Sequence, residues 1–232
     1  IKPRFLPALD EGFRPAVLAN HAFLREVDAS GAGVPLILGL ERADGSVSRF
    51  ETHVFPDRHA RANANLMYVE RILKFLLWQR GGWKVYVGGP KRIGDYIAQC
   101  YAPVGERAFD HQFMGQDVYE HTFTVVSCAA DGVPPEKETT RPLGRHLDGY
   151  RIGFDLGASD RKVSAVVNGE AIYSEEVVWE PRKHSDPSYH YNEILASLRT
   201  AAAKMPRVDA IGGSSAGVII NSVATTRHER LL

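Results

Sequence analysis

The sequence predicts an α/β fold in which mixed β-sheets are flanked by helices. Short runs of apolar and β-branched residues, bounded by Gly, Pro, Asn and Asp, alternate with longer segments whose apolar residues repeat at helical spacing. An order of strands, helix and strand occurs in each half of the chain. With 232 residues, of which 44% are hydrophobic, the chain can bury the core of one large domain or of two small ones.

The composition disfavours several functional classes. The 28 Lys and Arg residues balance 28 Asp and Glu residues, so the net charge does not favour nucleic acid as a partner. No window approaches the roughly 20 apolar residues of a membrane span, and the first residues contain no continuous apolar segment of a signal peptide. Cys100 and Cys128 have no metal-ligand spacing, which predicts reduced, mostly buried thiols. We therefore expect a cytoplasmic protein with no membrane partner.

The first 130 residues predict a lead-in followed by one α/β unit. Residues 1–33 mix Pro with short apolar runs and form a loop-rich lead-in, with room for a helix around residues 15–27. The first α/β unit spans residues 34–130. It starts with a hairpin, because the apolar and β-branched runs 34–42 and 47–55 are joined by an Asp-Gly turn.

A helix, a strand and a second helix continue this unit. Asn65 is positioned to cap the first helix and Gly81-Gly82 to end it. The apolar face of that helix consists of Leu66, Val69, Leu73, Leu76 and Leu77. Residues 83–87 predict a short buried strand, and Gly89-Pro90 opens a helix over residues 91–101. The residues that follow show no regular pattern.

The second half begins after a linker, which we place at residues 131–147 on its Pro, Gly and charged residues. Strands are predicted at residues 151–156, 162–168, 170–179 and 208–213. Asn168-Gly169 supplies a hairpin turn, and Asp186 with Pro187 begins a helix between the third and fourth strands. This half spans residues 148–232.

Both halves end their last predicted strand in a glycine pair, Gly88-Gly89 in the first and Gly212-Gly213 in the second. The shared order of parts favours a degenerate internal duplication. The alternative is a chance likeness between two α/β units of different length.

An acidic, glycine-containing loop joins the first two strands of the second half. A glycine bend leaves backbone N–H groups pointing outward, which suits phosphate oxygens, and a carboxylate just before it can hold magnesium through water. Asp155, Gly157, Ser159 and Lys162 have the chemistry for this pairing. The same residues also fit an ordinary turn capped by Asp155, so the residues alone leave both interpretations open.

Two motifs in this half resemble a known family. IGFDLGASDRKVSAVV, residues 152–167, resembles the first phosphate loop of the superfamily of sugar kinases, actin and heat-shock chaperone ATPases. VDAIGGSSAGVIIN, residues 208–221, resembles the segment of ROK-family sugar kinases and regulators in which a strand runs into Gly-x-x-x-x-Gly before the sugar site. The resemblance covers about residues 148–221 and implies ribonuclease H-like (actin-like ATPase) units, with ATP and Mg²⁺ as cofactors.

The resemblance implies a role for each matching residue. Asp155 corresponds to the magnesium-associated carboxylate, while the backbone of Gly157 and Ala158 and the hydroxyl of Ser159 correspond to phosphate-binding groups, with Lys162 beside them. The wall near the sugar corresponds to Gly213, Ser214, Ser215 and Gly217.

One position departs from the family pattern. Asp160 stands where the family tends to place a lysine. We therefore expect Arg161 or Lys162 to compensate its negative charge.

The first unit carries a further likeness. VYVGGPKRIGDYI, residues 85–97, resembles the adenosine-binding stretch of the same superfamily, although an ordinary strand-to-helix turn at Gly88-Gly89-Pro90 is the alternative. Glu41 stands roughly where Asp155 stands in the later unit, but no glycine follows it. We therefore expect the first hairpin to be a structural copy without the phosphate chemistry.

The ROK resemblance implies ATP-dependent phosphorylation of a sugar by the full-length parent protein. Residues 148–232 would form the start of the kinase-like domain, truncated before the second wall of the cleft. Because phosphoryl transfer needs both walls, we expect this chain alone to be inactive. The alternative is a non-catalytic ROK-like sugar sensor or interaction protein. A homo-oligomer is expected only by analogy with the family.

Overall fold

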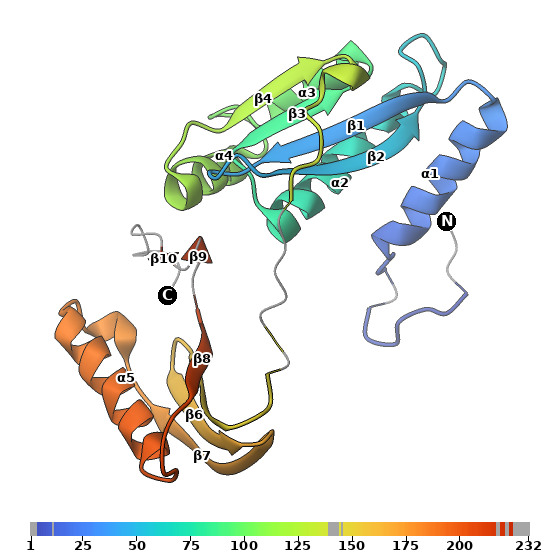
Figure 1. Cartoon of the computed structure of the whole chain (residues 1–232). Helices are drawn as coiled ribbons and strands as arrows, with labels where there is room; N and C mark the ends of the chain where they lie inside the picture. The colour runs from blue at the N-terminus through green and yellow to red at the C-terminus, as the bar shows by residue number, and fades with distance from the viewer. Residues whose placement is uncertain are drawn as a thin grey trace. The chain divides into compact units, whose positions relative to one another are not determined.

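The computed structural model describes residues 4–10, 12–138, 144 and 146–216, and the backbone of residues 219–220 and 223–224 (Figure 1). The chain divides into two compact units, which we call unit 1, residues 1–140, and unit 2, residues 141–232. Among the described residues, no helix is both long and apolar enough to cross a membrane. Both units combine strands and helices, which confirms the predicted α/β class with mixed sheets.

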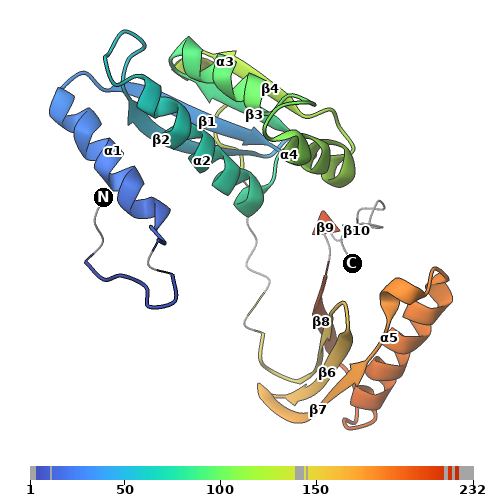
Figure 2. The same cartoon turned by 180° about the vertical axis from the view of Figure 1, so that it is seen from behind.

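Unit 1 is built on a four-stranded mixed sheet in the order β2-β1-β3-β4. Its strands are β1 (Val34–Glu41), β2 (Val47–Val54), β3 (Lys84–Gly88) and β4 (Thr124–Cys128). Its helices are α1 (Ala16–Ser30), α2 (Asn63–Arg80), α3 (Lys91–Cys100), α4 (Ala108–Gln112), the π-helical η1 (Phe113–Tyr119) and the short η2 (Ala130–Gly132). β1 is antiparallel to both β2 and β3, whereas β3 and β4 are parallel. Figure 2 shows α2 and α3 on the same face of this sheet.

The core of unit 1 forms where the first strand meets the first long helix. Leu36, Leu38 and Leu40 alternate along β1 and are fully buried, as are Leu73 and Leu77 of α2. The predicted hairpin and both predicted helices are present, with ends close to those expected from the sequence. Burial of these apolar side chains is the main stabilisation of unit 1.

Asn65 does not cap α2, which corrects the sequence prediction. It lies inside the helix, and its side-chain Nδ2 donates to the Phe55 carbonyl at 2.7 Å while its Oδ1 accepts from the Phe55 N–H at 3.1 Å. This amide is buried. Asn65 therefore ties the segment after β2 to the helix, which satisfies two backbone groups that would otherwise be buried without partners.

The segment without a regular pattern contains α4, η1 and β4. β4 is only five residues long. It is held in the sheet by parallel pairing with β3, from Lys84 opposite Thr124 to Gly88 opposite Cys128. Such a short strand carries too little local pattern to be predicted.

Unit 2 contains a second four-stranded sheet in the order β7-β6-β5-β8. Its elements are β5 (Tyr150–Leu156), β6 (Asp160–Val167), β7 (Glu170–Val178), the short η3 (Pro181–Lys183), α5 (Pro187–Ala202) and β8 (Ala210–Ser215). β9 (Ile219–Ile220) and β10 (Val223–Ala224) form a separate antiparallel pair. β5 is antiparallel to β6 and parallel to β8.

Two predicted local signals in unit 2 are confirmed. Asp186 caps α5, because its carboxylate accepts from the Ser188 N–H at 2.9 Å. Asn168 and Gly169 turn the β6–β7 hairpin with φ of 49° and 88°, the left-handed conformations that such a tight turn requires.

The two sheets differ in strand order and direction, so their topology adds no support to the predicted duplication. In unit 1 the central pair β1–β3 is antiparallel, and only two strands precede the first crossing helix of the sheet. In unit 2 three antiparallel strands precede the helix, and the strand after it returns parallel to the first. The glycine pairs therefore end strands that occupy different places in different sheets.

Candidate functional site

The two faces of the unit 2 sheet have different chemistry. Ile152 and Phe154 of β5 pack with residues of α5, in a small core that includes Val163 and Ala165 of β6 and Ala201 of α5. Because successive side chains of a strand point to opposite faces, Asp155 lies on the face away from α5. We call this second surface the open face, because no described helix of unit 2 packs on it.

Strand pairing aligns a row of polar residues across the open face. Asp155 is paired with Lys162 on β6 and with Ser214 on β8, and Lys162 is paired with Glu176 on β7. The Ser214 hydroxyl donates to Asp155 Oδ1 at 2.5 Å. The sheet thus places three expected site residues side by side: Asp155 for the metal, Lys162 for phosphate and Ser214 for the sugar wall.

The loop from Gly157 to Ser159 closes the hairpin next to Asp155. The Gly157 N–H donates to the Asp160 carbonyl at 2.9 Å. A Cβ added to Gly157 would lie 2.9 Å from that same oxygen, so the close approach requires glycine here. Within the described chain, the N–H groups of Ala158 and Ser159 donate to no protein acceptor. Ala158 and Ser159, and not Gly157, therefore offer free backbone donors.

Lys162 compensates the charge of Asp160, and Arg161 does not. The Lys162 ammonium hydrogen-bonds to Asp160, which together with the Ser159 hydroxyl lowers the pKa of the Asp160 carboxyl below its usual value. Lys162 also lies 3.9 Å from a Glu176 oxygen. Arg161 is buried on the opposite face, where its Nε and Nη2 donate to Glu193 Oε2 of α5 at 3.0 and 2.7 Å. The polar row and the loop therefore carry three carboxylates around one ammonium.

The four residues expected at the sugar wall do not share one surface. Ser214 lies on the open face with Asp155, whereas Gly213 and Ser215 alternate with it and point to the other face. A Cβ on Gly213 would lie 2.5 Å from the Phe154 carbonyl oxygen, so this glycine is required for strand packing. Gly217 lies outside the described residues.

Two glycines that were not among the expected site residues leave part of the open face without side chains. Gly153 of β5 and Gly212 of β8 are paired, and a Cβ added to either would meet no atom within 4 Å. Beside them, the hydroxyls of Ser164 and Ser174 hydrogen-bond at 2.8 Å. The alternation of side chains along each predicted strand could have identified these residues, because it places every second residue from Asp155 on the same face.

Trp179 is a further residue that the sequence analysis missed. Its indole Nε1–H donates to the Gly157 carbonyl at 2.8 Å, and its backbone N–H donates to the Ser159 carbonyl at 3.1 Å. The side chain is buried and meets the His190 ring edge-on, with 6.0 Å between ring centroids. Trp179 thus connects the loop to the end of β7 and to α5.

No preformed metal cage is present in the part of the chain that the structure describes. No group of three or more His, Cys, Asp or Glu side chains is arranged there to hold a metal ion. Asp155 offers one carboxylate with an oxygen not engaged by Ser214. Such a residue fits a magnesium ion held mainly by phosphates and water, which is the usual coordination of that ion.

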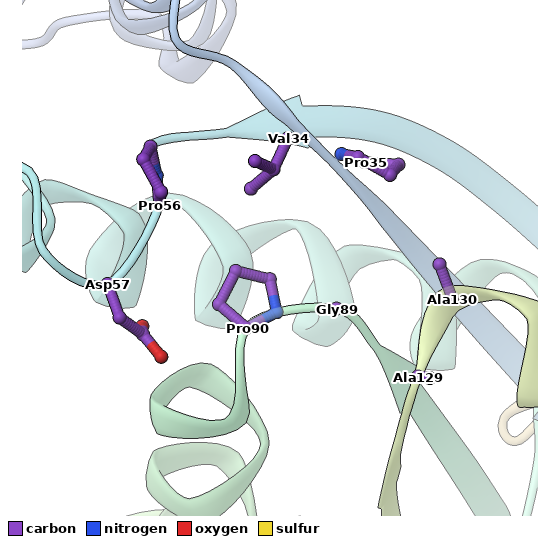
Figure 3. Close-up of a pocket in the computed structure, with 8 residues that line it drawn as sticks. All are labelled: Val34, Pro35, Pro56, Asp57, Gly89, Pro90, Ala129 and Ala130. Carbon is purple, nitrogen blue, oxygen red and sulfur yellow. The ribbon is translucent and has the colours of Figure 1, made fainter.

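Unit 1 has a shallow depression of about 370 Å³ where its four strands meet loops, close to the Gly88-Gly89-Pro90 segment (Figure 3). The residues around it are Val34, Pro35, Pro56, Asp57, Gly89, Pro90, Ala129 and Ala130. Asp57 is the one charged residue in this set. A Cβ on Gly88 would lie 2.3 Å from Val133 Cγ2, and a Cβ on Gly89 would lie 2.9 Å from Leu36 Cδ1. Both glycines are therefore required by protein packing.

Glu41 has no phosphate loop beside it. Its carboxylate accepts from the Tyr86 hydroxyl at 2.7 Å and lies 3.6 Å from Lys84 Nζ. These partners on β3 explain the position of the Glu41 carboxylate without a ligand.

A search of family models finds no match to this chain, and comparison with curated proteins and with solved structures finds no match either.

Proposed function

We propose that unit 2 binds the phosphates of Mg²⁺-ATP at the loop after β5, in a ROK-like protein that uses ATP to phosphorylate a sugar. The observation that carries this proposal is the position of Asp155 near the end of a central strand, shortly before a loop whose Ala158 and Ser159 N–H groups have no acceptor among the described residues. Asp155 also lies beside a hydroxyl from the neighbouring parallel strand. The strand order β7-β6-β5-β8, with three antiparallel strands, a helix and a parallel return, also supports a ribonuclease H-like unit.

The donor set fits magnesium and a nucleotide. Asp155 would hold the ion through water, and the N–H groups of Ala158 and Ser159 would donate to phosphate oxygens. When bound, magnesium supplies neutralisation of the charge on the transferring phosphoryl group. Ser214 keeps the Asp155 carboxylate in place by its hydrogen bond.

The charge of the site predicts an absolute need for the metal. Asp155, Asp160 and Glu176 outnumber Lys162, whose ammonium hydrogen-bonds to Asp160. Free ATP would meet net repulsion at this surface, because phosphate and carboxylate charges have the same sign. We therefore expect ATP to bind only together with Mg²⁺.

The engagement of Lys162 favours a second candidate, a sugar sensor without catalysis. Because Asp160 takes the ammonium, phosphate gains no free cation from the polar row. The open face instead offers hydroxyls from Ser164, Ser174 and Ser214 around the bare Gly153 and Gly212. Hydroxyls and carboxylates at a flat surface suit a polyol ligand.

Calorimetric titration separates the two candidates. Mg²⁺-ATP, ATP with a chelator and a panel of hexoses are titrated into the protein and into Asp155→Asn. Heat of binding for Mg²⁺-ATP that disappears in Asp155→Asn supports the kinase proposal. Hexose binding without any nucleotide binding supports the sensor, and binding of Mg²⁺-ATP that is equal in both proteins contradicts the assignment of Asp155.

A further inference from the structure

Trp179 binds carbonyl groups of the loop from Gly157 to Ser159 and leaves N–H groups of the loop unengaged. Every loop residue carries a donor and an acceptor that need partners. Two of the three loop carbonyls, those of Gly157 and Ser159, accept from the indole and the backbone N–H of Trp179. Among the residues that the structure describes, the N–H groups of Ala158 and Ser159 and the Ala158 carbonyl have no partner. The loop therefore presents mainly donors.

We infer that Trp179 is a positioning residue that makes this loop selective for phosphate-type anions. The inference deepens the proposed function and rests on it. A carbonyl turned outward would repel phosphate oxygens and attract cations or hydroxyl donors. Because Trp179 holds the Gly157 and Ser159 carbonyls inward, the partial positive charge of the N–H groups dominates the outer side of the loop.

Tryptophan suits this role for a chemical reason. The indole N–H only donates, so it pairs with a carbonyl and cannot turn around to accept from a loop N–H. Trp179 is 6% exposed, and its ring lies against that of His190 of α5, which fixes the direction of the N–H. A hydroxyl or an amide at the same place could both donate and accept, so it would allow the loop to turn either a carbonyl or an N–H group toward it.

Replacement of Trp179 by Phe keeps an aromatic ring and removes the indole donor. The Gly157 carbonyl then loses its partner and turns toward the solvent side of the loop or stays unsatisfied. We expect Mg²⁺-ATP to bind about tenfold more weakly, the order of effect of one hydrogen bond. The backbone bond from Trp179 to Ser159 remains, so binding is weakened and not abolished.

Unit 1 offers a matched control. The Trp78 indole also donates a hydrogen bond, to Asp110 Oδ1 at 2.6 Å, and Trp78→Phe makes the same chemical change far along the sequence in the other unit. Both variants are titrated with Mg²⁺-ATP and with Mg²⁺-pyrophosphate, and their unfolding by urea is measured. The inference expects weaker binding of both anions by Trp179→Phe alone.

A second readout follows the Trp179 indole in the unchanged protein and uses variants only to assign its signal. The chain has three tryptophans, so a nitrogen–proton correlation spectrum contains three indole signals, and that of Trp179 is the one missing in Trp179→Phe. The inference expects this signal to shift on addition of Mg²⁺-pyrophosphate while the other two do not. It holds even where Trp179→Phe proves too unstable to titrate, because the Trp78→Phe and Trp83→Phe spectra identify the remaining signal.

Three outcomes are separable. Weaker anion binding by a folded Trp179→Phe, together with a shifted Trp179 signal, supports the inference. Equal affinity of Trp179→Phe and the unchanged protein, or an unmoved Trp179 signal while Mg²⁺-ATP binds, overturns the inference and leaves the proposed function standing. No binding of Mg²⁺-ATP or Mg²⁺-pyrophosphate to the unchanged protein overturns both.

Discussion

Unit 1 and unit 2 place similar sequence features in different surroundings. Gly88 of unit 1 has a protein side chain 2.3 Å from where its Cβ would lie, whereas Gly212 of unit 2 faces open space. Glu41 of unit 1 is engaged by Tyr86 and Lys84 of the neighbouring strand. In the described part of unit 2, by contrast, one oxygen of Asp155 and the N–H groups of the nearby loop have no protein partner. A strand-end acid or a glycine pair therefore indicates a ligand site only where the surrounding packing leaves it exposed.

The largest expected effect is on the core of unit 1. Leu73 is completely buried between α2 and the sheet. Leu73→Ala should lower the free energy of unfolding by about 2–5 kcal/mol, because it removes apolar contacts and leaves a cavity. Urea unfolding measures the loss. Binding of Mg²⁺-ATP at 25 °C should be unchanged in the folded fraction. A parallel loss of binding would mean that nucleotide binding depends on unit 1 and not on unit 2 alone.

Asp155→Asn tests whether the strand-end acid of unit 2 binds the metal of Mg²⁺-ATP. The substitution keeps the size of the side chain and an acceptor for the Ser214 hydroxyl, so the free energy of unfolding should change by less than about 1 kcal/mol. Affinity for Mg²⁺-ATP should fall by about a hundredfold or more, because the charge that faces the metal is lost. Glu41→Gln is the control in unit 1 and should leave nucleotide affinity unchanged.

A pair of glycine substitutions sharpens the contrast between the sheets. Gly88→Ala places a methyl group 2.3 Å from Val133 Cγ2 and 3.1 Å from the Ala129 carbonyl oxygen, and should destabilise the protein by about 1–3 kcal/mol through overpacking. Gly212→Ala meets no atom within 4 Å and should stay within about 0.5 kcal/mol of the unchanged protein. Urea unfolding of both variants tests the pair, and equal destabilisation would contradict an open face at Gly212.

The smallest expected effect concerns helix capping and pH. Asp186 caps α5, whereas α1, α2 and α3 of unit 1 have no side-chain cap. The Ser188 N–H lowers the pKa of the Asp186 carboxyl, so the folded pKa lies below the unfolded value of roughly 3.9. The stabilisation is therefore complete above that unfolded value and is lost as pH falls through the folded pKa.

Asp186→Asn retains a capping oxygen but has no proton to gain. Thermal unfolding of the variant and of the unchanged protein should differ by a constant amount at neutral and mildly acidic pH. The difference should change only below about pH 4, where the carboxyl of the unchanged protein takes up its proton. A difference that already changes near pH 6 would mean that another group is responsible.

The sequence predicted the elements that depend on local pattern. The Asp-Gly and Asn-Gly hairpins, the α2 stripe and the Asp186 cap arise from neighbours in the chain, and all are present. β4 was not predicted, because its five residues become a strand only by pairing with β3. The same limit explains why Asn65 was given the wrong role: its partner Phe55 lies in a preceding loop.

The candidate site was predicted only in part for a similar reason. Asp155 and its loop are visible in one short motif, but the Ser214 hydroxyl comes from 59 residues further along the chain. Trp179 reaches Gly157 across 22 residues. Strand parity could have assigned Arg161 to the α5 face with Val163, since both alternate with Lys162. Contacts between strands, and not residue types, decide which polar groups share a surface.

The place where Mg²⁺-ATP binds can be observed residue by residue in an amide nitrogen–proton spectrum of the protein. If unit 2 is the nucleotide-phosphate unit, the amide signals of Ala158 and Ser159 shift most on titration, signals of unit 1 stay in place, and a chelator reverses the change. Shifts confined to Gly89, Ala129 and Ala130 around the unit 1 depression, or no shifts at all, would contradict nucleotide binding by unit 2.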